Sequence, residues 1–138
     1  MNVIVDTSVW SLALRRHRSQ RAAEVLELGE LIREGRAVML GPVRQELLSG
    51  VPSAEQYTTL REHLRAFPDL PVDAEDYEEA ATFFNRCRAR GIQGSNTDFL
   101  ICAAAARRGS AILTTDADFV HFAKVLPVQL HAPREVTG

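Results

Sequence analysis

Short apolar runs alternate along the chain with longer segments that repeat their apolar positions at helical spacing. The β-branched run Val3-Ile4-Val5 is continuous and predicts a buried strand, and residues 37–40 and 111–113 have the same character. Weaker strands are expected at 70–72, where Pro71 removes a ladder donor, and at 128–130. Because strands alternate with helices, the sequence predicts an α/β fold, with a central, mostly parallel sheet of about four to five strands flanked by helices.

The expected helices are bounded by capping residues and glycines. In the longest one, Tyr77, Ala80, Ala81, Phe84 and Cys87 form a single apolar stripe. Residues 99–106 are apolar on all sides, which indicates a central, buried helix. The expected ranges are a first helix running through Trp10 to Leu14, then 20–34, 43–48, 53–67, 73–90, 96–107 and 116–122.

Composition narrows the class of protein without naming a partner. The chain has 138 residues, of which 46% are hydrophobic and 25% charged, and this favours one soluble domain over residues 1–138. The formal net charge of −2 gives no bulk attraction for nucleic acid, so a nucleic-acid partner would need local charge. Cys87 and Cys102 are expected to be buried free thiols. Without a signal peptide or a membrane-length apolar run, we expect a cytoplasmic protein with no membrane partner.

Four acidic residues fall where the predicted topology brings the ends of the elements together. Asp6 directly follows the first strand, and Asp116 follows the strand at 111–113. Glu46 lies about one turn into the helix after the second strand, and Asp98 lies in the first turn of the buried helix. Because ligands of parallel sheets bind beyond the carboxyl ends of the strands, all four are candidates for one site.

Each of these acids also has a structural interpretation. Asp6 and Asp116 could cap helices, and Ser95 with Asp98 has the spacing of a capping box. Glu46 could be a solvated residue on a helix face. Taken together, however, clustered carboxylates repel one another unless cations neutralise them. A carboxylate set without a Cys or His pattern suits Mg²⁺ or Mn²⁺, which can support phosphodiester hydrolysis.

The segments around these acids resemble the motifs of the PIN-domain family. The opening Val3-Ile4-Val5-Asp6-Thr7-Ser8-Val9-Trp10 resembles the family's first motif, and Glu46-Leu47-Leu48-Ser49-Gly50 its second. Residues 98–104 (DFLICAA) and 113–119 (LTTDADF) resemble the third and fourth. All four occur in family order and at family-like spacing, and a stand-alone domain of this size is most similar to VapC-type toxins of toxin–antitoxin pairs.

This resemblance implies a Mg²⁺- or Mn²⁺-dependent endoribonuclease that is inhibited by a VapB-type antitoxin. It also implies a homodimer, for which Trp10, Leu12 and Leu14 offer an apolar helix face. The implied catalytic and metal-binding residues are Asp6, Glu46, Asp98 and Asp116. The implied supporting residues are Thr114, Asp118 and Thr7.

The arginine runs have two interpretations. Arg15, Arg16 and Arg18 lie near the first acidic motif and are candidates for binding the RNA backbone. Arg86, Arg88 and Arg90 and the pair Arg107-Arg108 could act similarly, or all could be solvated helix surface. Trp10 is expected in the core or an interface, with stacking on a base as the alternative.

Two other functions remain open at this point. One is a PIN-like module that binds RNA or protein without cleaving. The other is a phosphoacceptor receiver domain, although such domains need adjacent acids after the first strand and here only Asp6 is present.

Overall fold

The computed structural model of the chain describes residues 1–14 and 22–135. Its centre is a parallel sheet of three strands in the order β2-β1-β3, formed by β1 (Val3–Val5), β2 (Ala37–Val38) and β3 (Ala111–Leu113). Val3 pairs with Ala37 on one side and with Ala111 on the other. All three residues of β1 are buried, as its uninterrupted apolar sequence predicts.

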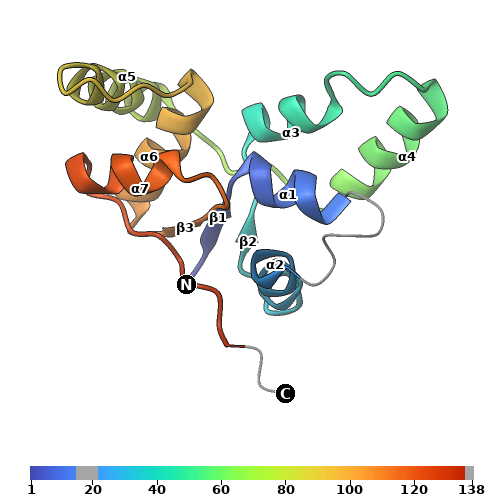
Figure 1. Ribbon diagram of the computed structural model, residues 1–138. Helices are drawn as coiled ribbons and strands as arrows, with labels where there is room; N and C mark the ends of the chain where they lie inside the picture. The colour runs from blue at the N-terminus through green and yellow to red at the C-terminus, as the bar shows by residue number, and fades with distance from the viewer. Residues whose placement is uncertain (15–21, 136–138) are drawn as a thin grey trace.

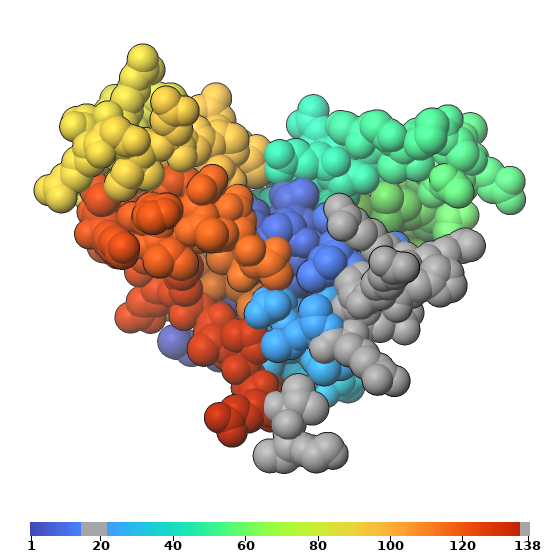
Figure 2. Space-filling model, viewed as in Figure 1, coloured from blue at the N-terminus to red at the C-terminus, as the bar shows by residue number. Residues whose placement is uncertain are grey.

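The helices form two groups, one on either side of the sheet (Figure 1). One group packs α1 against α2 and α3, and α3 against α4; the other packs α5 against α6 and α7. Figure 2 shows a notch between the two groups, with α3 and α4 on one side and α5 to α7 on the other. The helices are α1 (Thr7–Leu14), α2 (Ala23–Arg33), α3 (Gly41–Leu48), α4 (Ala54–Leu64), α5 (Ala74–Arg88), α6 (Asn96–Arg108) and α7 (Asp118–Val125).

The sheet is smaller than the four to five strands expected from the sequence. Two further segments each make only one parallel bridge, Met39 with Asp69 and Ile112 with Leu130, on the outer sides of β2 and β3. Beside the first bridge, Pro71 lacks the N–H group that a longer ladder would need. The described residues therefore contain three strands, extended at each edge by a single bridge.

The buried face of α5 differs from the predicted stripe. Asp76, Ala80, Phe83 and Cys87 are buried, whereas Tyr77 and Ala81 are exposed and Phe84 is half-buried. The helix is thus rotated by about one residue relative to the expectation. The sequence pattern misassigned this face because Asp76, a charged residue, occupies one of its central positions.

Arginines of α6 account for the burial of Asp76. Its side chain is 0% exposed, and its carboxylate accepts hydrogen bonds from Arg107 Nη1 at 2.6 Å and from Arg108 Nη1 and Nη2 at 2.7 and 2.9 Å. Hydrogen bonds from Arg108 are the largest cause that lowers the pKa of Asp76, assisted by the backbone N–H of Asp73 and by Arg107. This ion pair fixes α5 against the end of α6.

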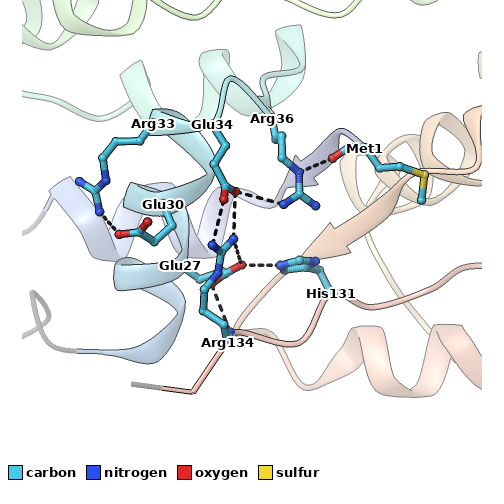
Figure 3. Close-up of polar contacts among 8 residues, drawn as sticks. All are labelled: Met1, Glu27, Glu30, Arg33, Glu34, Arg36, His131 and Arg134. Atoms are coloured by element: carbon cyan, nitrogen blue, oxygen red, sulfur yellow. Dashed lines mark hydrogen bonds and ion pairs between the residues drawn. The ribbon is translucent and has the colours of Figure 1, made fainter. Parts of the chain in front are cut away.

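A second buried acid holds the end of the described chain against α2 (Figure 3). Glu27 is 2% exposed and accepts hydrogen bonds from Arg134 Nε and Nη2 at 2.8 and 3.1 Å, and lies 2.6 Å from His131 Nε2. Burial acts to raise the pKa of Glu27, but the bonds from Arg134 and His131 outweigh it, and the pKa is lowered. Arg134 also binds Glu34 and lowers the pKa of Glu34 to about 2.

The buried residues form one continuous core that extends from α1 to α4 on one side of the sheet to α5, α6 and α7 on the other. Residues 99–105 of α6 are all buried, as the apolar character of this segment predicts. Cys87 and Cys102 are buried free thiols, and burial raises the pKa of both. Trp10 is 3% exposed and packs on Phe67 with the ring centroids 4.9 Å apart, so its core interpretation is confirmed. No helix within the described ranges is both long and apolar enough to cross a membrane.

The Asp76 cluster makes the stability depend on pH. Because the pKa of Asp76 is lower in the folded state than in the unfolded chain, its stabilisation is present above about pH 4 and is lost as the pH falls towards the folded-state pKa. We expect Asp76→Asn to lower the free energy of unfolding at pH 7 by about 2–3 kcal/mol. Urea denaturation at pH 7, 5 and 3.5 should show this deficit shrinking at the lowest pH.

Glu75→Gln is the matched control, because Glu75 binds the same Arg107 from an exposed position on the same helix. Exposed ion pairs contribute little, so we expect this variant to stay within about 0.5 kcal/mol of the wild type at every pH. Equal losses in the two variants would contradict a special role for the buried acid.

Candidate active site

The four predicted acids lie at the ends of elements that border the notch. Asp6 joins the carboxyl end of β1 to α1, and its backbone N–H donates to Leu113 O, at the corresponding end of β3, at 2.9 Å. Glu46 is carried by α3 and Asp98 by the first turn of α6. Asp116 lies between β3 and α7. This is the carboxyl edge of a parallel sheet, where the topology predicts a ligand site.

Two hydroxyl groups hold Asp6. Ser8 Oγ and Thr114 Oγ1 donate to Asp6 Oδ2 at 2.7 and 2.8 Å. The same hydroxyl oxygens accept backbone N–H groups of the segment after β3: Thr115 N donates to Ser8 at 3.1 Å, and Asp116 N donates to Thr114 at 2.9 Å. Asp6, 4% exposed, and the half-buried Asp116 are therefore joined through one hydroxyl.

Glu46 is joined to the same region through Thr7. Thr7 Oγ1 donates to Glu46 Oε1 at 2.8 Å, which connects the start of α1 to α3. Glu46 is exposed, as expected of a solvated residue on a helix face. Its side chain is nevertheless bound, because it accepts the hydrogen bond from Thr7, the residue after Asp6.

Asp98 is held by the capping box that its spacing from Ser95 predicts. Ser95 N donates to Asp98 Oδ2 at 3.0 Å, and Asp98 N donates to Ser95 Oγ at 3.1 Å. The preceding loop is fixed by Gly94, where an added Cβ would lie 2.6 Å from the ring of Phe122. Only glycine fits this close approach, so the loop has a defined conformation that fixes the positions of Ser95 and Asp98.

Electrostatic coupling shows that three of the acids are neighbours. Burial raises the pKa of Asp98, and the negative charges of Asp6 and Asp116 raise it further, against the lowering effect of the bonds from Ser95. Asp98 is thus a desolvated carboxylate with two like charges near it.

The acids have no basic partner within the described part of the chain. None of the ion pairs formed by residues 1–14 and 22–135 includes Asp6, Glu46, Asp98 or Asp116. In the same ranges, no three His, Cys, Asp or Glu side chains lie together as a group that could hold a metal ion. The arrangement is an open acidic edge, and a cation there would need water or substrate oxygens besides the carboxylates.

The supporting residues named from the sequence occupy different positions. Thr114 contacts Asp6 and Asp116, and Thr7 contacts Glu46. Asp118 is exposed and contributes its backbone N–H, which donates to Asp116 Oδ1 at 2.9 Å, so Asp116 also has the helix-terminus role considered above.

The structure tests only some of the arginines that were candidates for binding RNA. Arg15, Arg16 and Arg18 lie outside the described residues. Arg107 and Arg108 bind Asp76, so for this pair the structure favours an internal role over RNA contact.

Sequence reasoning missed one residue of the site, Ser8. In the sequence it was named only as part of the first motif, whereas its hydroxyl binds Asp6 and the backbone of Thr115. The available signal was its position two residues after an acid at a strand end, but its partner at Thr115 is 107 residues away in the sequence.

Comparisons with known proteins agree with this arrangement. The family model of the PIN domain matches residues 3–125. A VapC ribonuclease of Mycobacterium bovis and the ribonuclease VapC11 of Mycobacterium tuberculosis are each 36% identical to the chain over 130 residues, which are 92% of this chain and 96% of each relative.

Solved structures support the same fold. FitAcB from Neisseria gonorrhoeae has a TM-score of 0.75 at 23% identity and covers 95% of this chain and 97% of that one. VapBC2 from Rickettsia felis, bound to a DNA fragment from its promoter, has a TM-score of 0.73 at 17% identity and covers 95% of this chain and 98% of that one. The receiver-domain alternative is thereby excluded. The chain belongs to the PIN domain family and, within it, to the VapC ribonucleases.

Proposed function

We propose that this chain is a single-domain, Mg²⁺- or Mn²⁺-dependent endoribonuclease that hydrolyses RNA phosphodiester bonds with Asp6, Glu46, Asp98 and Asp116. The observation that carries the proposal is the presence of these acids at one sheet edge without a basic partner in the described chain. Membership of the VapC ribonucleases supplies the reaction class.

Two buried acids outside the candidate site, Asp76 and Glu27, have structural roles and provide a comparison. Asp76 and Glu27 are as buried as Asp6, and both are neutralised by arginines, which lower their pKa values. At the candidate site the pKa of Asp98 is instead raised. Arginines supply the positive charge next to Asp76 and Glu27. At the candidate site, a bound cation would supply that charge.

The donor set fits a hard divalent cation. Carboxylate oxygens are its preferred protein ligands, and Mg²⁺ is commonly held by one or two carboxylates while it keeps several waters or phosphate oxygens. Within the described residues no three of these side chains form a group that could hold a metal ion, so in this proposal water or substrate oxygens complete the ligand set. When bound, such an ion supplies an activated water and stabilises charge on the leaving oxygen.

The chain's own residues have distinct tasks in this proposal. Asp6, at the strand end, is held by hydroxyls and forms the fixed point of the site. Asp98 and Asp116 are positioned by backbone N–H groups, and Glu46 by Thr7. The notch in Figure 2 leaves this edge open to an extended substrate.

Asp98→Asn separates catalysis from helix capping. Asn caps helices about as well as Asp, so a purely structural role predicts nearly full activity. We expect RNA cleavage to fall by about 100-fold or more, because a metal ligand is lost. Metal-free stability should hold or rise, since a carboxylate with a raised pKa is removed. The measurements are cleavage of RNA with Mg²⁺ or with EDTA, and thermal melting with and without Mg²⁺.

The matched control is Asp73→Asn, another capping aspartate, which lies at the start of α5 and bonds with Asp76 and Arg107 rather than with the four acids. Its activity and its Mg²⁺-induced rise in melting temperature should match those of the wild type. Full activity of Asp98→Asn with an unchanged Mg²⁺ shift would contradict the assignment, as would undiminished cleavage by metal-free wild-type protein.

The proposal extends to a toxin that is inhibited by a VapB-type antitoxin in the cytoplasm, where RNA is available. The support is the family and the similarity in fold to complexes described as FitAcB and VapBC2. A basic antitoxin side chain would be favoured at an acidic edge that offers no internal cation.

Growth measurements test the toxin role. Induction of the wild-type protein in a bacterial host should slow growth, and co-expression of the cognate antitoxin should restore it. Asp6→Asn should be harmless at the same protein level, because it removes a metal ligand. Equal growth with the wild type and with Asp6→Asn in several hosts would remove the support for a toxin.

The homodimer expected from the sequence remains a proposal, but we place its interface on α5 rather than on α1. Trp10 is buried, whereas Leu12 is half-buried and Leu14 is 42% exposed, so α1 offers only part of the apolar face expected from the sequence. Tyr77 of α5 is 53% exposed and lines an apolar hollow of about 420 Å³ together with Pro42 and Phe84. The first half of α5 is acidic and its last turn is basic, which makes the helix complementary to an antiparallel copy of itself.

Light scattering at micromolar concentration should therefore give a dimer mass for the wild type. Tyr77→Glu should shift the mass towards a monomer, because it places a charge in the apolar hollow. Tyr57→Glu, at an exposed tyrosine of α4, should leave the mass unchanged. A monomeric wild type would contradict the dimer, and an unaffected Tyr77→Glu would contradict this surface.

A further inference from the structure

Each of the four acids has one oxygen that the protein itself holds. Asp6 Oδ2 accepts two hydroxyl groups, Glu46 Oε1 accepts Thr7, Asp98 Oδ2 accepts the backbone of Ser95, and Asp116 Oδ1 accepts the backbone of Asp118. Within the described residues, no hydrogen bond engages the other oxygen of any of the four. The site therefore presents four single oxygens rather than four freely rotating carboxylates.

Asp6 is the acid that is held most firmly. Ser8 and Thr114 donate to the same oxygen, and their own Oγ atoms lie 3.4 Å apart. An ionised carboxylate can only accept, so each hydroxyl must donate its single proton to Asp6. The lone pairs of Ser8 and Thr114 then accept the N–H groups of Thr115 and Asp116.

The two hydroxyls have different origins. Thr114 follows β3 and therefore moves with the Asp116 segment, whereas Ser8 belongs to the first turn of α1. Ser8 thus connects α1, the Asp6 carboxylate and the backbone after β3 through one oxygen. It is the group that couples the orientation of Asp6 to the position of the Asp116 segment.

We propose that Ser8 is a positioning residue for Asp6: its hydroxyl fixes Oδ2, so that Oδ1 alone remains to bind the divalent cation. Without it, Asp6 keeps only the bond from Thr114 and can rotate about that single contact. Ordering the carboxylate then costs free energy during metal binding, which lowers the affinity. This inference rests on the proposed metal-dependent function.

Mn²⁺ binding to the full chain is the direct test, read by electron paramagnetic resonance of free Mn²⁺ in a titration. We expect Ser8→Ala to weaken Mn²⁺ binding by about 10-fold, the lower end of the effect of removing a group that orients a metal ligand. Ser8→Cys keeps the shape with a weaker donor and should give an intermediate loss. Ser11→Ala, one helical turn further along α1, is the matched control and should bind as the wild type does.

Thermal melting distinguishes positioning from simple support of the fold. A purely structural role would lower the metal-free melting temperature of Ser8→Ala and leave the Mn²⁺-induced rise unchanged. Positioning predicts that the Mn²⁺-induced rise itself shrinks, because ligand binding stabilises according to affinity. If Ser8→Ala does not fold, the same comparison is made with Ser8→Cys.

The outcomes separate this inference from the proposed function. Wild-type protein that binds no Mn²⁺ would overturn both. Wild-type binding with equal affinity in Ser8→Ala, or in Ser8→Cys if that variant is used, would overturn the role of Ser8 and leave the metal-dependent function standing. A loss in Ser8→Ala that Ser11→Ala matches would also overturn it.

Discussion

Repulsion between carboxylates is the constraint around which this molecule is arranged. Asp98 is desolvated and faces the negative charges of Asp6 and Asp116, and these effects raise its pKa. Such a group disfavours the folded state in its ionised form, so the fold must hold it in place by other means. It does so with neutral donors, namely hydroxyls and backbone N–H groups, which orient the carboxylates without cancelling their charge.

The two internal acid clusters show the opposite solution. Asp76 joins α5 to α6 through two arginines, and Glu27 joins α2 to the end of the described chain through Arg134. In both, positive charge is built into the protein and the acid becomes a structural connection. Neutral donors hold the acids at the notch, whereas arginines hold Asp76 and Glu27, and this difference distinguishes the proposed site from the acids that connect helices.

Much of this architecture could be predicted from local sequence. The three strands and the seven helices follow from apolar runs, helical spacing and capping residues such as Asp73 and Ser95. The rotation of α5 could not, because it depends on Asp76 meeting Arg107 and Arg108 more than 30 residues away.

The site shows the same division. The positions of Asp6, Glu46, Asp98 and Asp116 follow from topology, since the carboxyl ends of parallel strands share one edge. Their catalytic roles remain predictions. The role of Ser8 depends on the backbone N–H of Thr115, more than 100 positions away in the sequence. No local sequence pattern indicates such a contact.

The clamp around Glu27 has a practical consequence for handling the protein. In Figure 1 the start of β1 and the segment that runs past α2 to Glu135 both point away from the notch, and Arg134 anchors that segment on Glu27 and Glu34. Surface attachment on the side of the molecule where this segment lies would therefore leave the acidic edge facing solution. The chain is accordingly suited to immobilisation on a sensor chip, with the proposed site accessible.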